Sequence, residues 1–163
     1  MKLREELCKS MGCAWIAAGV AAADLWLKKR AERRKESSRN RGAFLNLGQE
    51  RPELVRALSA GLTALVSALF LRTPFRKGSR LKKAGLALLL GGAVSNTYDR
   101  IKRGYVVDYI RLRTGIPAVD RVVFNLADFA VFLGSLLTAL GAWAGARGRP
   151  VRSSAASARG FCG

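Results

Sequence analysis

Long apolar runs alternate with segments rich in Lys and Arg along most of the chain. The runs cover about residues 11–28, 54–71, 81–98 and 122–146. Each can supply the ~20 residues that a membrane-spanning helix needs. Glycine recurs inside them; it is unfavourable within a soluble helix but allows close helix packing in a membrane. The pattern therefore predicts an all-α membrane protein with four transmembrane helices.

We expect the four predicted helices to form a single domain, residues 1–146, and residues 147–163 to form a basic, flexible cytoplasmic tail. The first run has the basic start and short apolar core of a signal peptide. However, Asp24 and Trp26 make a poor cleavage region, and three more runs follow, so we expect an uncleaved helix. The last loop holds a strand-like stretch, residues 105–110, rich in Val, Ile and Tyr.

Charge adds a constraint on partners and on orientation. The 163 residues include 29 Lys and Arg against 11 Asp and Glu, a formal net charge of +18. Such an excess suits a nucleic-acid binder, but four crossings would divide it between two membrane faces, so we expect no nucleic-acid partner. Lys and Arg are almost evenly divided between alternate loops. Only the shortness of the basic loop 72–83 favours placing it, with both termini, in the cytoplasm.

The residue types that are present limit the chemistry. The chain has no His, which excludes Ser-His-Asp and Cys-His catalysis and His-ligated zinc. Cys8, Cys13 and Cys162 lie near the termini, away from the polar residues discussed next, and we expect free thiols. We expect neither a metal nor a cofactor.

Polar residues in the runs gather at one predicted membrane surface. If the helices cross in turn, the ends of the first and third helices and the start of the fourth meet there. Ionisable groups in membrane spans are costly and suggest function. The residues placed there are Asp24, Asn96, Asp99, Asn125 and Asp128, with Asp108 in the loop between the third and fourth helices.

Some of these residues have ordinary explanations. Asp24 and Lys28 are spaced as an i,i+4 ion pair at a helix end. Asp99 and Arg100, at the end of the third helix, have the pattern of an interfacial anchor. The sequence alone leaves both explanations open beside a functional one.

Asp128 is harder to explain structurally, because it lies one turn inside an apolar run with Asn125 one turn before it on the same side. If Asp108 faces Asp128, the two carboxyls cannot both ionise readily at a low-dielectric edge, so they share a proton. The ionised member can activate water while the protonated member polarises a carbonyl. This is the chemistry of an aspartic peptidase.

Five segments resemble the motifs of the signal peptidase II family, in the same order and with similar spacing. Residues 96–100 (NTYDR), 106–109 (VVDY) and 124–128 (FNLAD) resemble the blocks N-x-x-D-R, V-V-D-F and F-N-x-A-D. Residues 24–28 (DLWLK) and 40–44 (NRGAF) resemble D-Q-x-x-K and N-x-G-A-A-F more weakly. The resemblance extends over most of the chain.

This resemblance implies a four-helix aspartic endopeptidase of the bacterial plasma membrane. It would remove the signal peptide of a lipid-modified prolipoprotein just before the diacylglyceryl-Cys. The extracytoplasmic loops would form a small β-like cradle and a half-embedded helix over the site. The implied catalytic pair is Asp108 and Asp128, and the implied supporting residues are Asp24, Lys28, Asn40, Asn96, Asp99, Arg100 and Asn125.

We expect the partners to be the prolipoprotein substrate and membrane lipid, including anionic lipid, and the working form to be a monomer; the sequence assigns no role to the basic loop 28–52. The chain departs from the family pattern at Leu25, where Gln is usual, and at Phe44, which follows a single Ala. These departures bear on substrate range more than on the chemistry.

Two other classes remain as alternatives. A non-catalytic relative could bind lipoprotein precursors or scaffold a membrane complex, but the intact Asp108 and Asp128 argue against it. A proton- or cation-coupled transporter would carry its carboxylates near the middle of the bilayer, whereas these gather near one surface.

Overall fold

Four long helices form where the sequence predicts apolar spans. The computed structural model describes residues 2–43, 47–73 and 79–147. Its helices are α1 (Lys2–Arg33), α2 (Pro52–Leu71), α3 (Arg80–Arg103), the short α4 (Pro117–Asp120) and α5 (Leu126–Arg147). Of the predicted tail, only Arg147 lies within the described residues.

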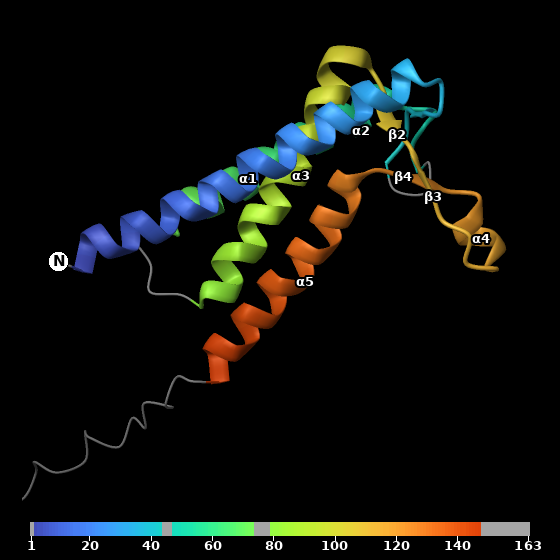
Figure 1. Ribbon diagram of the computed structural model, residues 1–163. Helices are drawn as coiled ribbons and strands as arrows, with labels where there is room; N and C mark the ends of the chain where they lie inside the picture. Colours follow the sequence, from blue (N-terminus) through green and yellow to red (C-terminus); the bar gives the residue numbers. More distant parts are fainter. Residues whose placement is uncertain (1, 44–46, 74–78, 148–163) are drawn as a thin grey trace, which may run out of the picture.

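The helix α3 is the centre of the fold. It contacts each of the other three long helices, and α5 most extensively. In Figure 1, α1 and α5 run along α3, while the strands and α4 gather at one end of the helices. A small apolar cluster around Phe70 and Leu86 joins α2 to α3, and the free thiol of Cys13 in α1 packs near it. The Cys8 side chain and Cys162 lie outside the described residues.

Glycine lets α3 and α5 approach until their backbones touch. A Cβ atom at Gly85 would lie 2.6 Å from the Thr138 backbone nitrogen, and one at Gly134 would lie 2.5 Å from the Leu89 backbone nitrogen. No side chain fits at such distances. The small residues that seemed costly in a soluble helix therefore make the tightest helix contact of the structure's described part.

Two small antiparallel sheets stand beyond the helix ends. The strands are β1 (Ser38–Asn40), β2 (Val106–Asp108), β3 (Ile110–Arg111) and β4 (Val123–Phe124). β1 pairs with β2, so that Ser38 lies opposite Asp108, and β3 pairs with β4. α3 ends where Gly104 adopts a left-handed conformation, with φ 76°, and turns the chain into β2. The predicted strand-like stretch 105–110 is confirmed.

The predicted start of the last helix is wrong by four residues. Residues 122–125 do not continue the helix, because Val123 and Phe124 pair with β3 as strand β4 and α5 begins only at Leu126. The first and third helices are longer than predicted. α1 continues past Lys28 to Arg33, and α3 continues past Tyr98 to Arg103.

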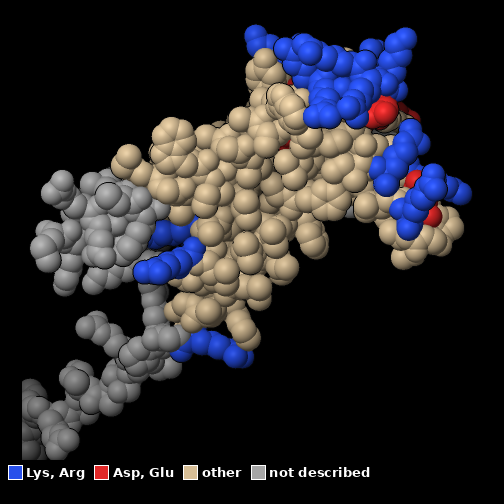
Figure 2. All heavy atoms as spheres, viewed as in Figure 1, with Lys and Arg blue, Asp and Glu red and all other residues tan. Residues whose placement is uncertain are grey.

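Among the described helices, α2 and α5 are long and apolar enough to cross a membrane. Their large side chains face outward: Leu62 is 62% exposed and Phe132 is 73% exposed. Figure 2 shows an uncharged surface along the helices in this view, with Lys and Arg massed at the strand end and fewer at the other end. Such a surface suits contact with lipid rather than water.

The close contact of α3 and α5 predicts a sharp difference between two glycine variants. Gly134→Ala should push the helices apart and destabilise the protein by about 1–3 kcal/mol, the usual effect of overpacking. Gly61→Ala is the matched control, because a Cβ at Gly61 meets nothing within 4 Å. The measurement is the thermal unfolding midpoint in detergent. Equal midpoints for the two variants would contradict the proposed packing.

Candidate active site

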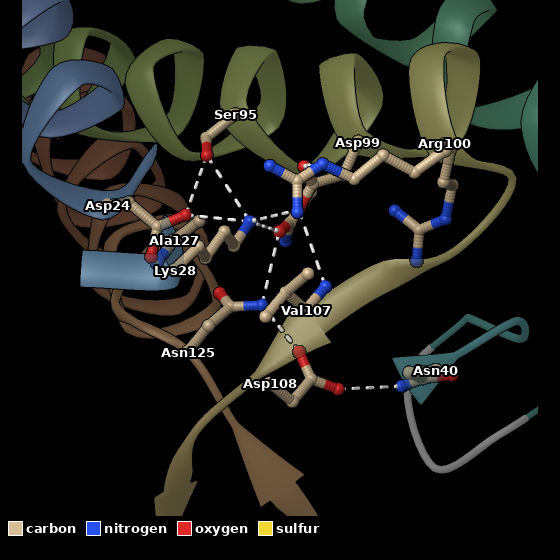
Figure 3. A network of polar contacts seen from close by, with 12 residues as sticks. Asp24, Lys28, Asn40, Ser95, Asp99, Arg100, Val107, Asp108, Asn125 and Ala127 are labelled. Carbon is tan, nitrogen blue, oxygen red and sulfur yellow. Dashed lines mark hydrogen bonds and ion pairs between the residues drawn. The ribbon is translucent and has the colours of Figure 1, made fainter. Parts of the chain in front are cut away.

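A buried cation lies where α1, α3 and α5 meet below the strands. The Lys28 ammonium lies 2.7 Å from Asp24 Oδ2 and 3.1 Å from Asp99 Oδ2, and all three side chains are fully buried. The ammonium also donates hydrogen bonds to Ser95 Oγ at 3.3 Å and to Asn96 Oδ1 at 2.9 Å. Figure 3 shows most of this network. The Asp24–Lys28 pair, ordinary by its spacing, is thus the middle of a buried charge cluster.

Asp24 ties α1 to the start of α5. Its Oδ1 accepts hydrogen bonds from the Tyr109 hydroxyl at 3.0 Å and from the Ala127 backbone N–H at 3.2 Å. Its Oδ2 accepts a bond from Ser95 Oγ at 2.6 Å. Ser95 and Tyr109 were not among the site residues predicted from the sequence. Their only signals were that each stands next to a predicted site residue, Ser95 before Asn96 and Tyr109 in the VVDY motif.

Asp99 performs the corresponding role toward β2. Its Oδ2 accepts a hydrogen bond from the Val107 backbone N–H at 3.3 Å, and its Oδ1 forms an ion pair with Arg103 Nε at 3.2 Å. Arg103 also reaches Glu32 of α1 at 2.6 Å. Because Asp99 is completely buried, it is not the interfacial anchor that its position at a helix end suggested. It fixes the strand residue that precedes Asp108.

Asn125 is the N-cap of α5, not a residue of the helix. Its Oδ1 accepts the Asp128 backbone N–H at 2.9 Å, and Asp128 Oδ2 accepts the Asn125 backbone N–H at 3.1 Å. This reciprocal pair is a capping box. It leaves the Asn125 Nδ2 amide free to donate to Asp108 Oδ1 at 2.7 Å and to Asn96 Oδ1 at 3.2 Å.

Side-chain amides join the two carboxyls that the sequence pairs. Asn96 Nδ2 donates to Asp128 Oδ1 at 2.9 Å, and the bond between Asn125 and Asn96 continues the path to Asp108. On its other side, Asp108 Oδ2 accepts a bond from Asn40 Nδ2 of β1 at 3.1 Å. Asp108 is 2% exposed, and burial and the negative charge of Asp128 raise the pKa of Asp108 to about 6.

Arg100 extends from α3 toward the same place. Its Nη2 donates to the Gly42 carbonyl at 3.0 Å, while its buried Nε has no hydrogen-bond partner among the described residues. The carboxylates of Asp128 and Asp108 attract the guanidinium electrostatically. In Figure 3 the guanidinium of Arg100 lies on the side of Asp108 and Asn40. All nine predicted site residues therefore lie in one connected region.

A cavity of about 780 Å³ opens beside these groups. Its walls from α2, α3 and α5 are mostly apolar, with Leu62, Leu89 and Phe132 among them. Its polar end carries both Asp108 and Asp128. Within the described ranges, no group of three or more His, Cys, Asp or Glu side chains could hold a metal ion. The site offers two carboxyls, amides and one guanidinium at the end of an apolar groove.

The buried cation predicts an asymmetric effect of two neighbouring lysine substitutions. Lys28→Met should cost about 3–5 kcal/mol, because it leaves two carboxylates buried without their shared counter-charge. Lys29→Met removes an exposed charge and should leave stability almost unchanged. Unfolding midpoints in detergent measure both variants. If Lys28→Met is as stable as Lys29→Met, the buried charge cluster does not stabilise the protein as predicted.

Known proteins with similar sequences share one description. Residues 16–144 match the family described as signal peptidase (SPase) II. A lipoprotein signal peptidase of Geobacillus kaustophilus is 32% identical over 142 residues, which cover 78% of this chain and 90% of that protein. The lipoprotein signal peptidase of Methylocella silvestris is 33% identical over 125 residues, 72% of each chain. The lipoprotein signal peptidase of a Methylobacterium species is 38% identical over 110 residues, which cover 67% of this chain and 66% of that protein.

The fold is also similar to solved structures. One, described as a bacterial membrane enzyme, superposes with a TM-score of 0.71 at 19% identity and covers 86% of this chain and 93% of its own. A second has a TM-score of 0.66 at 20% identity. At these identities the likeness concerns the fold. With the sequence match over most of its length, the chain belongs to the signal peptidase II family, the aspartic peptidases that process lipoproteins.

Proposed function

We propose that Asp108 and Asp128 are the catalytic pair with which this chain removes signal peptides from lipid-modified prolipoproteins, cutting before the diacylglyceryl-Cys. As a member of the signal peptidase II family, the chain is an aspartic peptidase. One observation supports the assignment most strongly: both carboxyls line one cavity, and hydrogen-bonded amides of Asn96 and Asn125 link them.

The two carboxyls occupy different positions relative to the helix dipole of α5. The raised pKa of Asp108 favours the protonated form there. Each carboxyl accepts two hydrogen bonds, but only Asp128 lies in the first turn of α5, where the helix dipole favours a negative charge. Asp128 is thus the general base of the pair, and Asp108 is the general acid.

The reaction follows from these roles. Asp128 takes a proton from water, and the water oxygen bonds to the carbonyl carbon of the residue before the Cys. Asp108 donates its proton to the carbonyl oxygen. The C–N bond then breaks, and the amine of the Cys leaves with a proton from the pair. The products are a signal peptide with a free carboxyl group and a lipoprotein with a free α-amino group.

The remaining site residues position the substrate and the pair. Apolar walls of the large cavity suit both a signal peptide and acyl chains, which are apolar. The unpartnered Nε of Arg100 can donate to a substrate carbonyl. Asn40, on β1, donates a hydrogen bond to Asp108 Oδ2 and lines the same cavity.

The proposed enzyme crosses the bacterial plasma membrane four times, by α1, α2, α3 and α5. Both termini are cytoplasmic, and the strands and the site face the extracytoplasmic side. The two apolar helices α2 and α5 support this topology, as does the gathering of strands and buried charges at one end. The working form is a monomer surrounded by membrane lipid, with no nucleic-acid partner.

The topology predicts the location of inserted epitope tags. Tags near Glu36 and Thr114 should react with antibody in intact spheroplasts, because Glu36 precedes strand β1 of the site and Thr114 follows strand β3. Tags at either terminus, or within residues 72–83, should react only after permeabilisation. A tag at Thr114 that is hidden in intact spheroplasts would place the site on the wrong face for a secreted substrate.

The catalytic assignment predicts equal and non-additive losses. Asp108→Asn and Asp128→Asn are nearly isosteric, and each removes one member of a pair that acts as a unit. Each should lower cleavage of a diacylglyceryl-modified prolipoprotein about a thousandfold or more, and the double variant should lose little more. Asp120→Asn is the control, because the Asp120 carboxylate, in α4, accepts hydrogen bonds from Thr114 and Gly115 and lines neither cavity. Cleavage should survive chelators.

Two outcomes would contradict this assignment. Substantial cleavage by Asp128→Asn, with the chain folded, would remove Asp128 from the chemistry. A wild-type protein that binds the lipidated precursor but cuts neither it nor the unlipidated control would favour the non-catalytic alternative.

A further inference from the structure

A second cavity, of about 490 Å³, also borders Asp108. Its character is opposite to that of the apolar cavity, because its lining is mostly polar. Besides Asp108, the charged side chains around it are Arg39 in β1, Arg41 directly after β1, Arg121 before β4, and Glu50 before α2. The mechanism described above uses none of these four side chains.

The two cavities meet at the proposed catalytic pair. Asn40, Asp108, Val122 and Val123 line both of them, whereas Asp128 lines only the apolar one. A polypeptide that runs past Asp108 from the large cavity into the small one therefore passes from apolar to polar surroundings. A prolipoprotein has this order of properties, since an apolar signal peptide precedes the lipidated Cys and the water-soluble mature chain follows it.

The polar cavity carries an excess of positive charge. Arg39, Arg41 and Arg121 form no ion pair with any Asp or Glu in the described part of the chain, and all three are exposed. The guanidinium of Arg39 lies 5.1 Å from the centre of the Tyr105 ring, which orients it without neutralising it. Three guanidinium groups and two carboxyl groups, those of Glu50 and Asp108, line this cavity.

We propose that this basic cavity binds the first residues of the mature lipoprotein, directly after the Cys, and favours acidic side chains there. The inference rests on the proposed function, because it assumes that the bond before the Cys is held at Asp108. Arginine is suited to this role, since its planar guanidinium binds a carboxylate through two parallel hydrogen bonds. Lys or Arg at the same substrate positions would be repelled.

The experiment compares synthetic diacylglyceryl-modified peptides that differ only in the two residues after the Cys. These residues are Asp-Glu, Ser-Ser or Lys-Lys, and cleavage is followed in a neutral detergent. Exposed ion pairs contribute modestly, so kcat/KM should fall by about twofold to tenfold from the acidic to the basic peptide. The difference should shrink when the salt concentration is raised.

Matched double variants test whether the preference for acidic side chains arises at the basic cavity. Arg41→Gln with Arg121→Gln should bring the acidic-to-basic ratio of kcat/KM close to one. Arg111→Gln with Arg113→Gln removes the same charge from exposed positions that line neither cavity, and should leave the ratio unchanged. If both double variants lower the ratio equally, the effect is one of net charge, and the inference is wrong.

Cleavage of the three peptides distinguishes failure of this inference from failure of the proposed function. If wild type cuts all three peptides at one rate, the inference is overturned while the proposed function stands. If it cuts none, the proposed function fails. A further arm uses phosphatidylcholine vesicles with or without phosphatidylglycerol. If the Arg41 and Arg121 changes slow every peptide alike, and only with phosphatidylglycerol, the arginines contact an anionic lipid surface and the inference is overturned.

Discussion

The geometry of the site depends on the buried Lys28 ammonium and the two carboxylates that enclose it. Each carboxylate uses a further hydrogen bond to hold the backbone beside one member of the proposed pair. Asp24 accepts the N–H of Ala127, next to Asp128, and Asp99 accepts the N–H of Val107, next to Asp108. One cation from α1 therefore sets the positions of a strand and a helix whose two Asp residues must meet.

Such a cluster is a costly way to hold a fold together. Moving charges out of water costs several kcal/mol each, and their attraction repays this only when geometry and hydrogen bonds are good. Here Arg103 adds a second cation beside Asp99 and also pairs with Glu32 of α1, so that each buried carboxylate has a cation within ion-pair distance. The gain is in specificity, because any other arrangement of α1, α3 and β2 would leave a buried charge without a partner.

The sequence predicted the helices and the identities of the site residues better than it predicted their contacts. The apolar runs predicted four helices. Three motifs identified both Asp residues of the pair and the Asn residues whose amides link them. The start of α5 was wrong because it depends on pairing between β3 and β4, which are far apart in sequence. The spacing of Asp24 and Lys28 is the same in an exposed pair and a buried one, so their burial could not be predicted.

Other features had no local signal. Ser95 and Tyr109 act on Asp24 from different elements, and the basic cavity is formed by strands β1, β2 and β4 and the segments beside them. The membrane topology and the catalytic roles of Asp108 and Asp128 stay predictions, since the contacts support them without testing them.

The pH dependence of kcat/KM tests the sharing of a proton between Asp108 and Asp128 most directly. If the protonated form of Asp108 is required, kcat/KM should fall above about pH 6, where Asp108 loses its proton. The hydrogen bond from Asn40 stabilises the charged form and lowers this pKa, so Asn40→Ala should move the fall to higher pH. A profile that is flat across this range, or a shift to lower pH in Asn40→Ala, would contradict the account.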